Sequence, residues 1–129
     1  MIYLDSCIVI YAVESADEVG DRVRQAITGT TEVLAISPLV IHEALIRPTR
    51  AEQQRQARME SALTQFELVE LDLSAYVRAA ELRAQHPGLR APDALHLAAA
   101  ERSGCTRFWT NDKRLATASR GLSIDIVGA

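Results

Sequence analysis

The chain has 129 residues, of which 48% are apolar and 24% charged; this composition excludes disordered and fibrous classes and predicts a single domain over residues 1–129. Its two cysteines are far apart, which excludes a disulfide framework and a zinc spacing, and no apolar run approaches the roughly 18 residues of a membrane span, so we expect a cytoplasmic protein without a membrane segment. The net charge of −3 argues against a polyanionic partner. However, residues 47–58 contain four arginines and only one acid, Glu52, so this stretch is locally basic.

Short continuous apolar runs, which are typical of strands covered on both faces, alternate with segments of helical periodicity. In chain order, this pattern predicts strand 2–5, helix 6–13, helix 17–28, strand 32–37, helix 38–47, helix 49–66, strand 67–71, helix 74–85, helix 92–103, strand 107–110, helix 112–118 and strand 124–127. Pro38 and Pro92 begin two helices, Pro48 ends one, and Thr49 and Ser74 are expected N-caps. The alternation predicts a three-layer α/β/α sandwich with a mostly parallel five-stranded sheet.

Four acidic residues lie near the ends of the predicted strands. Asp5 ends the first strand, and Asp112 follows the fourth strand by two residues. Asp93 is in the first turn of the helix before the fourth strand, and Glu43 is in the second turn of the helix after the second strand. Ligands of open parallel sheets bind outside the carboxyl ends of the strands. These four acids are therefore the candidate catalytic and metal-binding residues.

Each acid, taken singly, also has a purely structural explanation. Asp5 and Asp112 stand between a strand and a helix, where an aspartate commonly serves as an N-cap. Asp93 lies where the helix dipole favours a negative charge. Glu43 is harder to explain in this way, because it shares a helical face with apolar neighbours. The same difficulty applies to Asp93, which lies in a helix that is apolar nearly all round. Burial of either carboxylate is costly unless something compensates its charge.

A divalent cation would compensate all four acids at once. No lysine or arginine is placed in the sequence where it would clearly pair with Glu43 or Asp93, and uncompensated carboxylates raise one another's pKa values. Hard oxygen ligands select Mg²⁺ or Mn²⁺. Thr110 and Asn111, just before Asp112, are expected to orient a water, a phosphate oxygen or a neighbouring carboxylate. The chemistry that follows is phosphoryl transfer or phosphodiester hydrolysis.

Four short stretches of the sequence, distributed over nearly the whole chain, resemble the PIN-domain ribonucleases. They read "MIYLDSCIVIY", "ISPLVIHEAL", "RAPDALHLAAA" and "FWTNDKRL". The most specific part of the resemblance is "TND" in combination with "APDALHLAAA". The length of the chain is similar to that of the VapC-type toxins of bacterial toxin-antitoxin pairs.

The resemblance carries its own expectations about fold, activity and partners. It implies a sheet of order 3-2-1-4-5 and a Mg²⁺- or Mn²⁺-dependent endoribonuclease, homodimeric and held inactive by an antitoxin that covers the acidic site. The four acids of the family fall on Asp5, Glu43, Asp93 and Asp112, and its polar position falls on Ser6 or on Thr110 and Asn111.

Basic residues near the acids are candidates for guiding RNA, because positive charge can hold a phosphate backbone that the acids would repel. The candidates are Arg47, Arg50, Lys113 and Arg114. For the arginines between residues 47 and 58, a solvated helix face is an equally good interpretation. His96, one turn after Asp93, is interpreted as a core or hydrogen-bonded histidine in preference to a metal ligand.

Other functional classes fit the sequence less well. A Mg²⁺-binding phosphoacceptor signalling domain needs an acid pair at the end of strand one and an aspartate after strand three, for which only Asp5 and Asp72 are available. A dehalogenase-like phosphatase needs a second aspartate where Cys7 stands. A purely non-catalytic interaction module leaves Glu43 and Asp93 unexplained.

Overall fold

A computed structural model describes residues 1–46, 53–119 and 122–128, and in it five strands form one sheet of order β3-β2-β1-β4-β5. The strands are β1 (Ile2–Leu4), β2 (Leu34–Ile36), β3 (Glu67–Leu68), β4 (Arg107–Thr110) and β5 (Ser123–Ile126). Every pairing is parallel, with Ile2 opposite Leu34 on one side of β1 and opposite Arg107 on the other. The expected fold class and strand order are confirmed.

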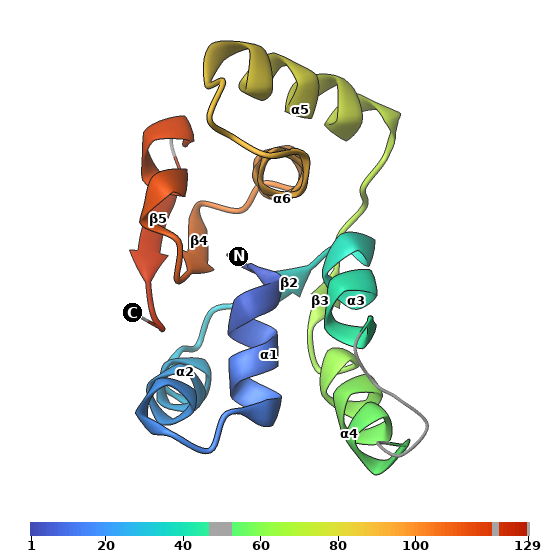
Figure 1. Ribbon diagram of the computed structural model, residues 1–129, viewed down its shortest axis with the longest axis vertical. Coiled ribbons are helices and arrows are strands. Elements are labelled where there is room, and N and C mark those ends of the chain that lie inside the picture. The colour runs from blue at the N-terminus through green and yellow to red at the C-terminus, as the bar shows by residue number, and fades with distance from the viewer. Residues whose placement is uncertain (47–52, 120–121, 129) are drawn as a thin grey trace.

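Helices cover both faces of this sheet, as Figure 1 shows. One face carries α1 (Ser6–Glu14), α2 (Glu18–Gly29), α3 (Pro38–Leu45) and α4 (Gln53–Leu63). The opposite face carries α5 (Leu73–Gln85), α6 (Ala91–Arg102) and the 3₁₀ helix η2 (Lys113–Ala118). The faces change between β1 and β4, because the chain moves outward in one direction from β1 to β3 and in the other from β4 to β5.

The core lies on both faces of the central strands. Tyr3 of β1 and Phe108 of β4 are fully buried and stack with ring centroids 5.2 Å apart. The alanine-rich helix α6 packs against the sheet with Leu97 and three alanines after it completely buried, as expected from its apolar circumference. None of the helices in the described ranges is both long and apolar enough to cross a membrane.

The boundaries differ from the predicted ones chiefly at the edge of the sheet. The expected strand 67–71 pairs only over Glu67–Leu68, with one further bond from Val69 N to Ile36 O, because β3 is an edge strand and the chain then leaves the sheet. Strand 32–37 is likewise reduced to Leu34–Ile36. The N-cap of α5 is Asp72 and not the expected Ser74.

Two expected helices also differ from the structure. Of the expected helix 49–66, the described part ends at Leu63, and the expected N-cap Thr49 and the preceding Pro48 lie outside the described residues. The expected helix 112–118 is a 3₁₀ helix whose N-cap is Asp112. Short 3₁₀ helices are common as connectors, and η2 connects β4 to β5.

Candidate active site

The candidate site lies at the carboxyl ends of β1 and β4, the two neighbouring strands between which the strand order reverses. Asp5 follows β1, and its backbone N–H bonds to the carbonyl of Trp109 at 3.0 Å. Thr110 ends β4 two residues before Asp112. Parallel pairing therefore brings the ends of both strands, which are far apart in sequence, to the same crevice.

Asp5 and Asp112 are joined through the fully buried Thr110. The Thr110 hydroxyl donates to Asp5 Oδ2 at 2.7 Å, and the backbone N–H of Asp112 donates to the same hydroxyl oxygen at 3.1 Å. Asp5 and Asp112 also cap their helices, by accepting from the backbone N–H groups of Ser6 and Arg114. Both residues are therefore N-caps, as the structural explanation expects. Capping does not explain the second carboxylate oxygen of Asp5, which accepts the bond from Thr110.

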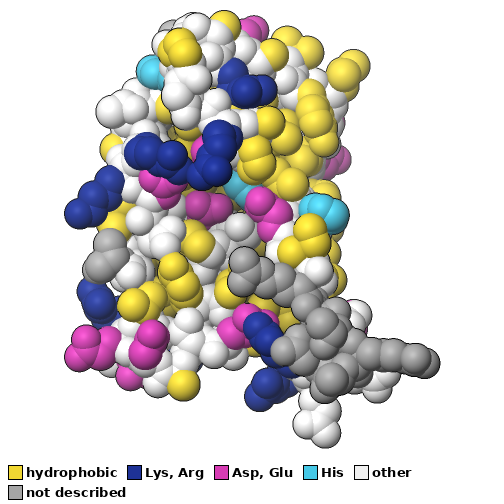
Figure 2. Space-filling model, in the orientation of Figure 1, with side chains coloured by type: hydrophobic (Ala, Val, Ile, Leu, Met, Phe, Trp, Pro, Cys, Tyr) yellow, Lys and Arg dark blue, Asp and Glu magenta, His cyan; other side chains and the backbone are white. Residues whose placement is uncertain are grey.

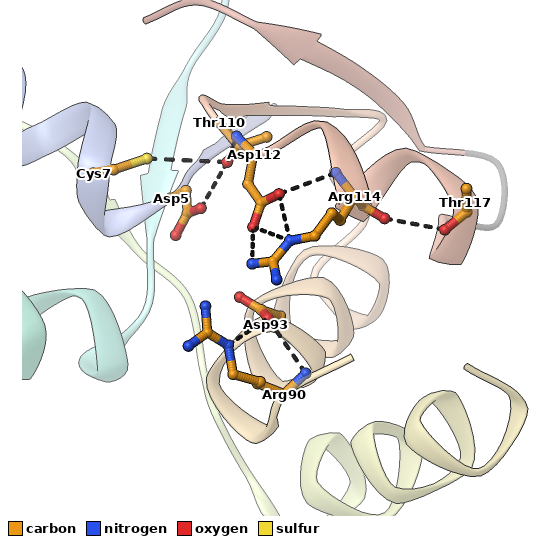
Figure 3. Close-up of polar contacts among 8 residues, drawn as sticks. All are labelled: Asp5, Cys7, Arg90, Asp93, Thr110, Asp112, Arg114 and Thr117. Carbon is orange, nitrogen blue, oxygen red and sulfur yellow. Dashed lines mark hydrogen bonds and ion pairs between the residues drawn. The ribbon is translucent and has the colours of Figure 1, made fainter. Parts of the chain in front are cut away.

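Asp93 reaches the same space from the first turn of α6 (Figure 3). Its carboxylate accepts a bond from the backbone N–H of Arg90 at 3.3 Å, and 20% of its side chain is exposed. Burial and the negative charges of Asp112 and Asp5 raise the pKa of Asp93, against the opposing effect of Arg90. Three aspartates from three elements therefore repel one another across one site.

Glu43 enters the site from α3 and is bound to a buried histidine. His96 Nε2 lies 2.5 Å from Glu43 Oε1 and 3.7 Å from Asp5 Oδ1. Burial alone would raise the pKa of Glu43, but bonds from His96 and from the Ser6 side chain outweigh it and hold that pKa below its usual value. The interpretation of His96 as a hydrogen-bonded histidine is confirmed.

Two arginines stand beside the acids, and one of them, Arg90, corrects the expectation that no arginine would pair with Asp93. Arg114 forms an ion pair with Asp112 at 2.6 Å and lowers the pKa of that carboxyl. Arg90 lies 4.0 Å from Asp93. Figure 3 shows the Arg114 guanidinium between the carboxylates of Asp112 and Asp93, and in Figure 2 basic side chains lie directly above acidic ones in the middle of the face.

The remaining predicted site residues have different surroundings. Asn111 donates to the hydroxyl of Tyr11 at 2.6 Å and to none of the four acids, so of the predicted polar residues Thr110 orients Asp5 and Ser6 orients Glu43 as expected. Lys113 is exposed beside Asp112. Arg47 and Arg50 lie outside the described residues.

Arg90 and Tyr3 are site residues that the sequence interpretation missed. The spacing of three residues between Arg90 and Asp93 is a visible signal, because such residues are neighbours on a helix. Tyr3 offers no such signal, since it is a β1 residue that meets His96 only in the folded protein.

A pocket of about 350 Å³ adjoins the acids on the side of η2. Asp93, Arg114 and Thr117 line it together with the loop between α5 and α6. Arg114 therefore faces both the carboxylates and an open hollow in the surface.

The side chains present fit a hard divalent cation in their chemistry. Carboxylates are the donors that Mg²⁺ and Mn²⁺ prefer. Burial and the charges of Asp112 and Asp5 raise the pKa of Asp93, and a cation would offset both effects. Within residues 1–46, 53–119 and 122–128, no three His, Cys, Asp or Glu side chains are gathered tightly enough to hold a metal together as they stand. Asp112 is already paired with Arg114 and Glu43 with His96, so a cation would have to compete with these partners.

The acid that a phosphoacceptor domain would need after strand three lies elsewhere. Asp72 caps α5 and is 4.0 Å from Arg102, the last residue of α6, whereas Asp93 is in the first turn of that helix. A helix of this length separates its ends by roughly 15 Å or more. Asp72 therefore belongs to the opposite end of the molecule.

Comparisons with known proteins agree with this arrangement. Residues 2–121 match the model of the PIN domain. Ribonuclease VapC23 of Mycobacterium tuberculosis is 40% identical over 70 residues, a match that spans 51% of this chain and only 56% of that relative.

Solved structures share the fold over nearly the whole chain. VapC20 of M. tuberculosis, a toxin that cleaves the sarcin-ricin loop, has a TM-score of 0.78 at 14% identity and covers 95% of this chain and 99% of its own. A toxin-antitoxin complex from Klebsiella pneumoniae has a TM-score of 0.77 at 21% identity and covers 95% of each chain. The match to the family model, which spans the elements that carry all four acids, shows that this chain belongs to the PIN-domain family.

Proposed function

We propose that this protein is a Mg²⁺- or Mn²⁺-dependent endoribonuclease and the toxin of a type II toxin-antitoxin pair. The observation that carries the proposal is the convergence of Asp5, Asp93, Asp112 and Glu43, from four separate segments, on the crevice between β1 and β4. The identity to ribonuclease VapC23 supports RNA as the substrate.

In this proposal the four acids hold the metal directly or through water. A bound Mg²⁺ or Mn²⁺ supplies a water of lowered pKa and stabilises negative charge on the leaving oxygen. Thr110 fixes one oxygen of Asp5, and Ser6 and His96 fix Glu43, so that the carboxylates are oriented before RNA arrives.

The basic side chains beside the acids are proposed to bind the phosphate backbone. Arg114 and Arg90 have 61% and 73% of their side chains exposed, and Lys113 is exposed as well. Arginine is well suited to such contacts because its planar guanidinium can form two bonds to one phosphate. Arg47 and Arg50 stay predictions of the same kind.

We also propose a cognate antitoxin, a cytoplasmic location and a homodimer. The similarity in fold to the toxin-antitoxin complex from K. pneumoniae supports the antitoxin. An apolar face of α5, formed by Leu73, Tyr76 and Val77, supports the dimer, because each of these residues is more than half exposed. Figure 2 shows hydrophobic side chains gathered in the upper part of this view of the molecule.

The test is cleavage of a structured RNA with Mg²⁺, with Mn²⁺ and with a chelator. We expect Asp5→Asn and Asp93→Asn to reduce metal-dependent cleavage by roughly 100-fold or more, as removal of a group that stabilises the transition state does. Asp72→Asn is the matched control, since it makes the same change at the far end of α6 and asparagine also caps helices well. Cleavage that persists with the chelator, or equal activity of all three variants, would contradict the proposal.

A further inference from the structure

A continuous chain of buried hydrogen bonds ends on Glu43. Tyr3 Oη lies 2.7 Å from Ser37 Oγ and 2.7 Å from His96 Nδ1, and His96 Nε2 lies 2.5 Å from Glu43 Oε1. Ser37 and Tyr3 are completely buried and His96 is 2% exposed, whereas Glu43 keeps 29% of its side chain exposed. This series of hydrogen bonds therefore leads from the interior, through side chains of β1 and α6, to one acid of the proposed site.

For a neutral His96, the chemistry of the four groups sets the direction of every bond. A carboxylate only accepts, so His96 Nε2 must donate to Glu43. In a neutral imidazole the other nitrogen then accepts, so Tyr3 donates its phenolic proton to Nδ1. The Tyr3 oxygen in turn accepts from Ser37, whose hydroxyl makes no capping bond to α3 although Ser37 is the N-cap residue. Each proton in the chain has one acceptor.

This arrangement leaves His96 no freedom to change tautomer or to rotate. The ring is enclosed, it contacts Tyr3 at a centroid distance of 5.7 Å, and both of its nitrogens are engaged. The same Nε2 also lies 3.7 Å from Asp5 Oδ1, so the imidazole sits between the acid that follows β1 and the acid on α3.

We propose that His96 is a positioning residue for Glu43. Glu43 and Tyr3 together hold it in the Nε2–H tautomer and Ser37 orients Tyr3, so that the carboxylate is fixed where a divalent cation needs it. The inference rests on the proposed function, because it assigns His96 a role in the metal site of that enzyme. His96 acts through Glu43 and not on the substrate.

The first test needs neither metal nor RNA. Nitrogen-15 NMR of the imidazole at about pH 8, where an ordinary histidine is neutral, reports which nitrogen carries the proton. We expect the Nε2–H tautomer for His96 in the wild type and still in Tyr3→Phe, because Glu43 accepts from Nε2 in both, and a mixture of tautomers in Glu43→Ala, which lacks that acceptor. The Nδ1–H tautomer in the wild type would overturn the inference.

The second test is calorimetric titration of Mn²⁺ into His96→Gln and His96→Asn. The amide nitrogen of glutamine can take the place of Nε2 and still donate to Glu43, whereas the shorter asparagine can replace only Nδ1. We expect His96→Gln to bind Mn²⁺ within a few-fold of the wild type, and His96→Asn to lose roughly 10- to 100-fold in affinity, the usual effect of losing a group that orients a ligand. Circular dichroism tests whether each variant is folded. If His96→Asn does not fold, Tyr3→Phe takes its place in the titration.

The outcomes separate the inference from the proposed function. A wild type that neither binds Mn²⁺ nor cleaves RNA would overturn the proposed function, and the role of His96 with it. A wild type that binds Mn²⁺, with the same affinity in His96→Asn and Tyr3→Phe, would overturn only the inference.

Discussion

Thr110, the last residue of β4, donates its hydroxyl proton to Asp5, the residue after β1, over 2.7 Å. The same hydroxyl oxygen accepts from the backbone of Asp112 at 3.1 Å. One fully buried side chain therefore holds two acids in register across the crevice where the strand order reverses. The position of these acids depends on a bond between strands and not only on their own helices.

Replacement of Thr110 by valine, which has nearly the same shape, should destabilise the protein and disturb the site together. Asp5 Oδ2 and the Asp112 N–H lose a buried partner, which typically costs about 1–3 kcal/mol in the free energy of unfolding. Denaturant unfolding measures this loss, and a cleavage assay should show a parallel fall in rate. Thr110→Ser keeps the hydroxyl and should recover most of both; a serine variant as impaired as the valine variant would mean that the methyl group matters and the hydrogen bond does not.

Asp93→Asn should raise the melting temperature of the metal-free protein by a few degrees at neutral pH. Burial and the charges of Asp112 and Asp5 raise the pKa of Asp93, so the folded protein keeps this proton to higher pH than the unfolded chain does. Stability therefore falls as the pH rises from the pKa of the unfolded state through that of the folded state, and at neutral pH the charged carboxylate opposes folding. Asparagine removes that charge and can still accept the bond from Arg90.

The control for Asp93 is the same comparison at about pH 3, below both pKa values, where the two proteins should melt alike. Added Mn²⁺ should stabilise the wild type more than Asp93→Asn. A variant that is less stable than the wild type at neutral pH would show that the capping role of Asp93 outweighs the repulsion.

The positions of the acids were predictable because each stands near a strand end or in the first turns of a helix, and parallel strands bring their carboxyl ends to one edge. Their charge partners were not all predicted. Arg114 and Arg90 are two and three residues from their acids, so local spacing contains this information. His96 and Glu43 are 53 residues apart, and their contact exists only because α3 and α6 meet at the end of the sheet.

Strand lengths were the least predictable part of the fold. The run "ELVEL" is apolar enough for five strand residues, but pairing at an edge depends on how far the neighbour extends, and β2 itself contains only Leu34–Ile36. Asn111 illustrates the same limit at the site. Its place in "TND" suggests a water, a phosphate oxygen or a carboxylate as its partner, whereas in the structure its amide donates to Tyr11 of α1.

If the proposed homodimer forms through α5, Val77→Lys should convert it to a monomer. Val77 is 55% exposed on the apolar face of α5, and a lysine there would place a charge inside the proposed contact, where it has no partner. Light scattering after gel filtration measures the mass of the wild type and the variant at the same concentration. Gln25→Lys adds the same charge on the exposed surface of α2 and should leave the mass unchanged. A variant that keeps the mass of a dimer would place the interface elsewhere.

Arg114→Met should weaken RNA binding and also change its dependence on salt. Each phosphate neutralised by a basic side chain releases counterions, so the slope of the logarithm of affinity against that of salt concentration should become shallower by about 0.7 for single-stranded RNA. Arg102→Met is the matched control, because Arg102 is also about half exposed and lies at the opposite end of α6 from Asp93. Fluorescence anisotropy of a labelled RNA, measured with Asp5→Asn in both backgrounds to prevent cleavage, gives the slopes. Equal slopes for the two variants would mean that Arg114 serves Asp112 and not the phosphate backbone, and the loss of its ion pair would then appear only as a higher pKa of Asp112.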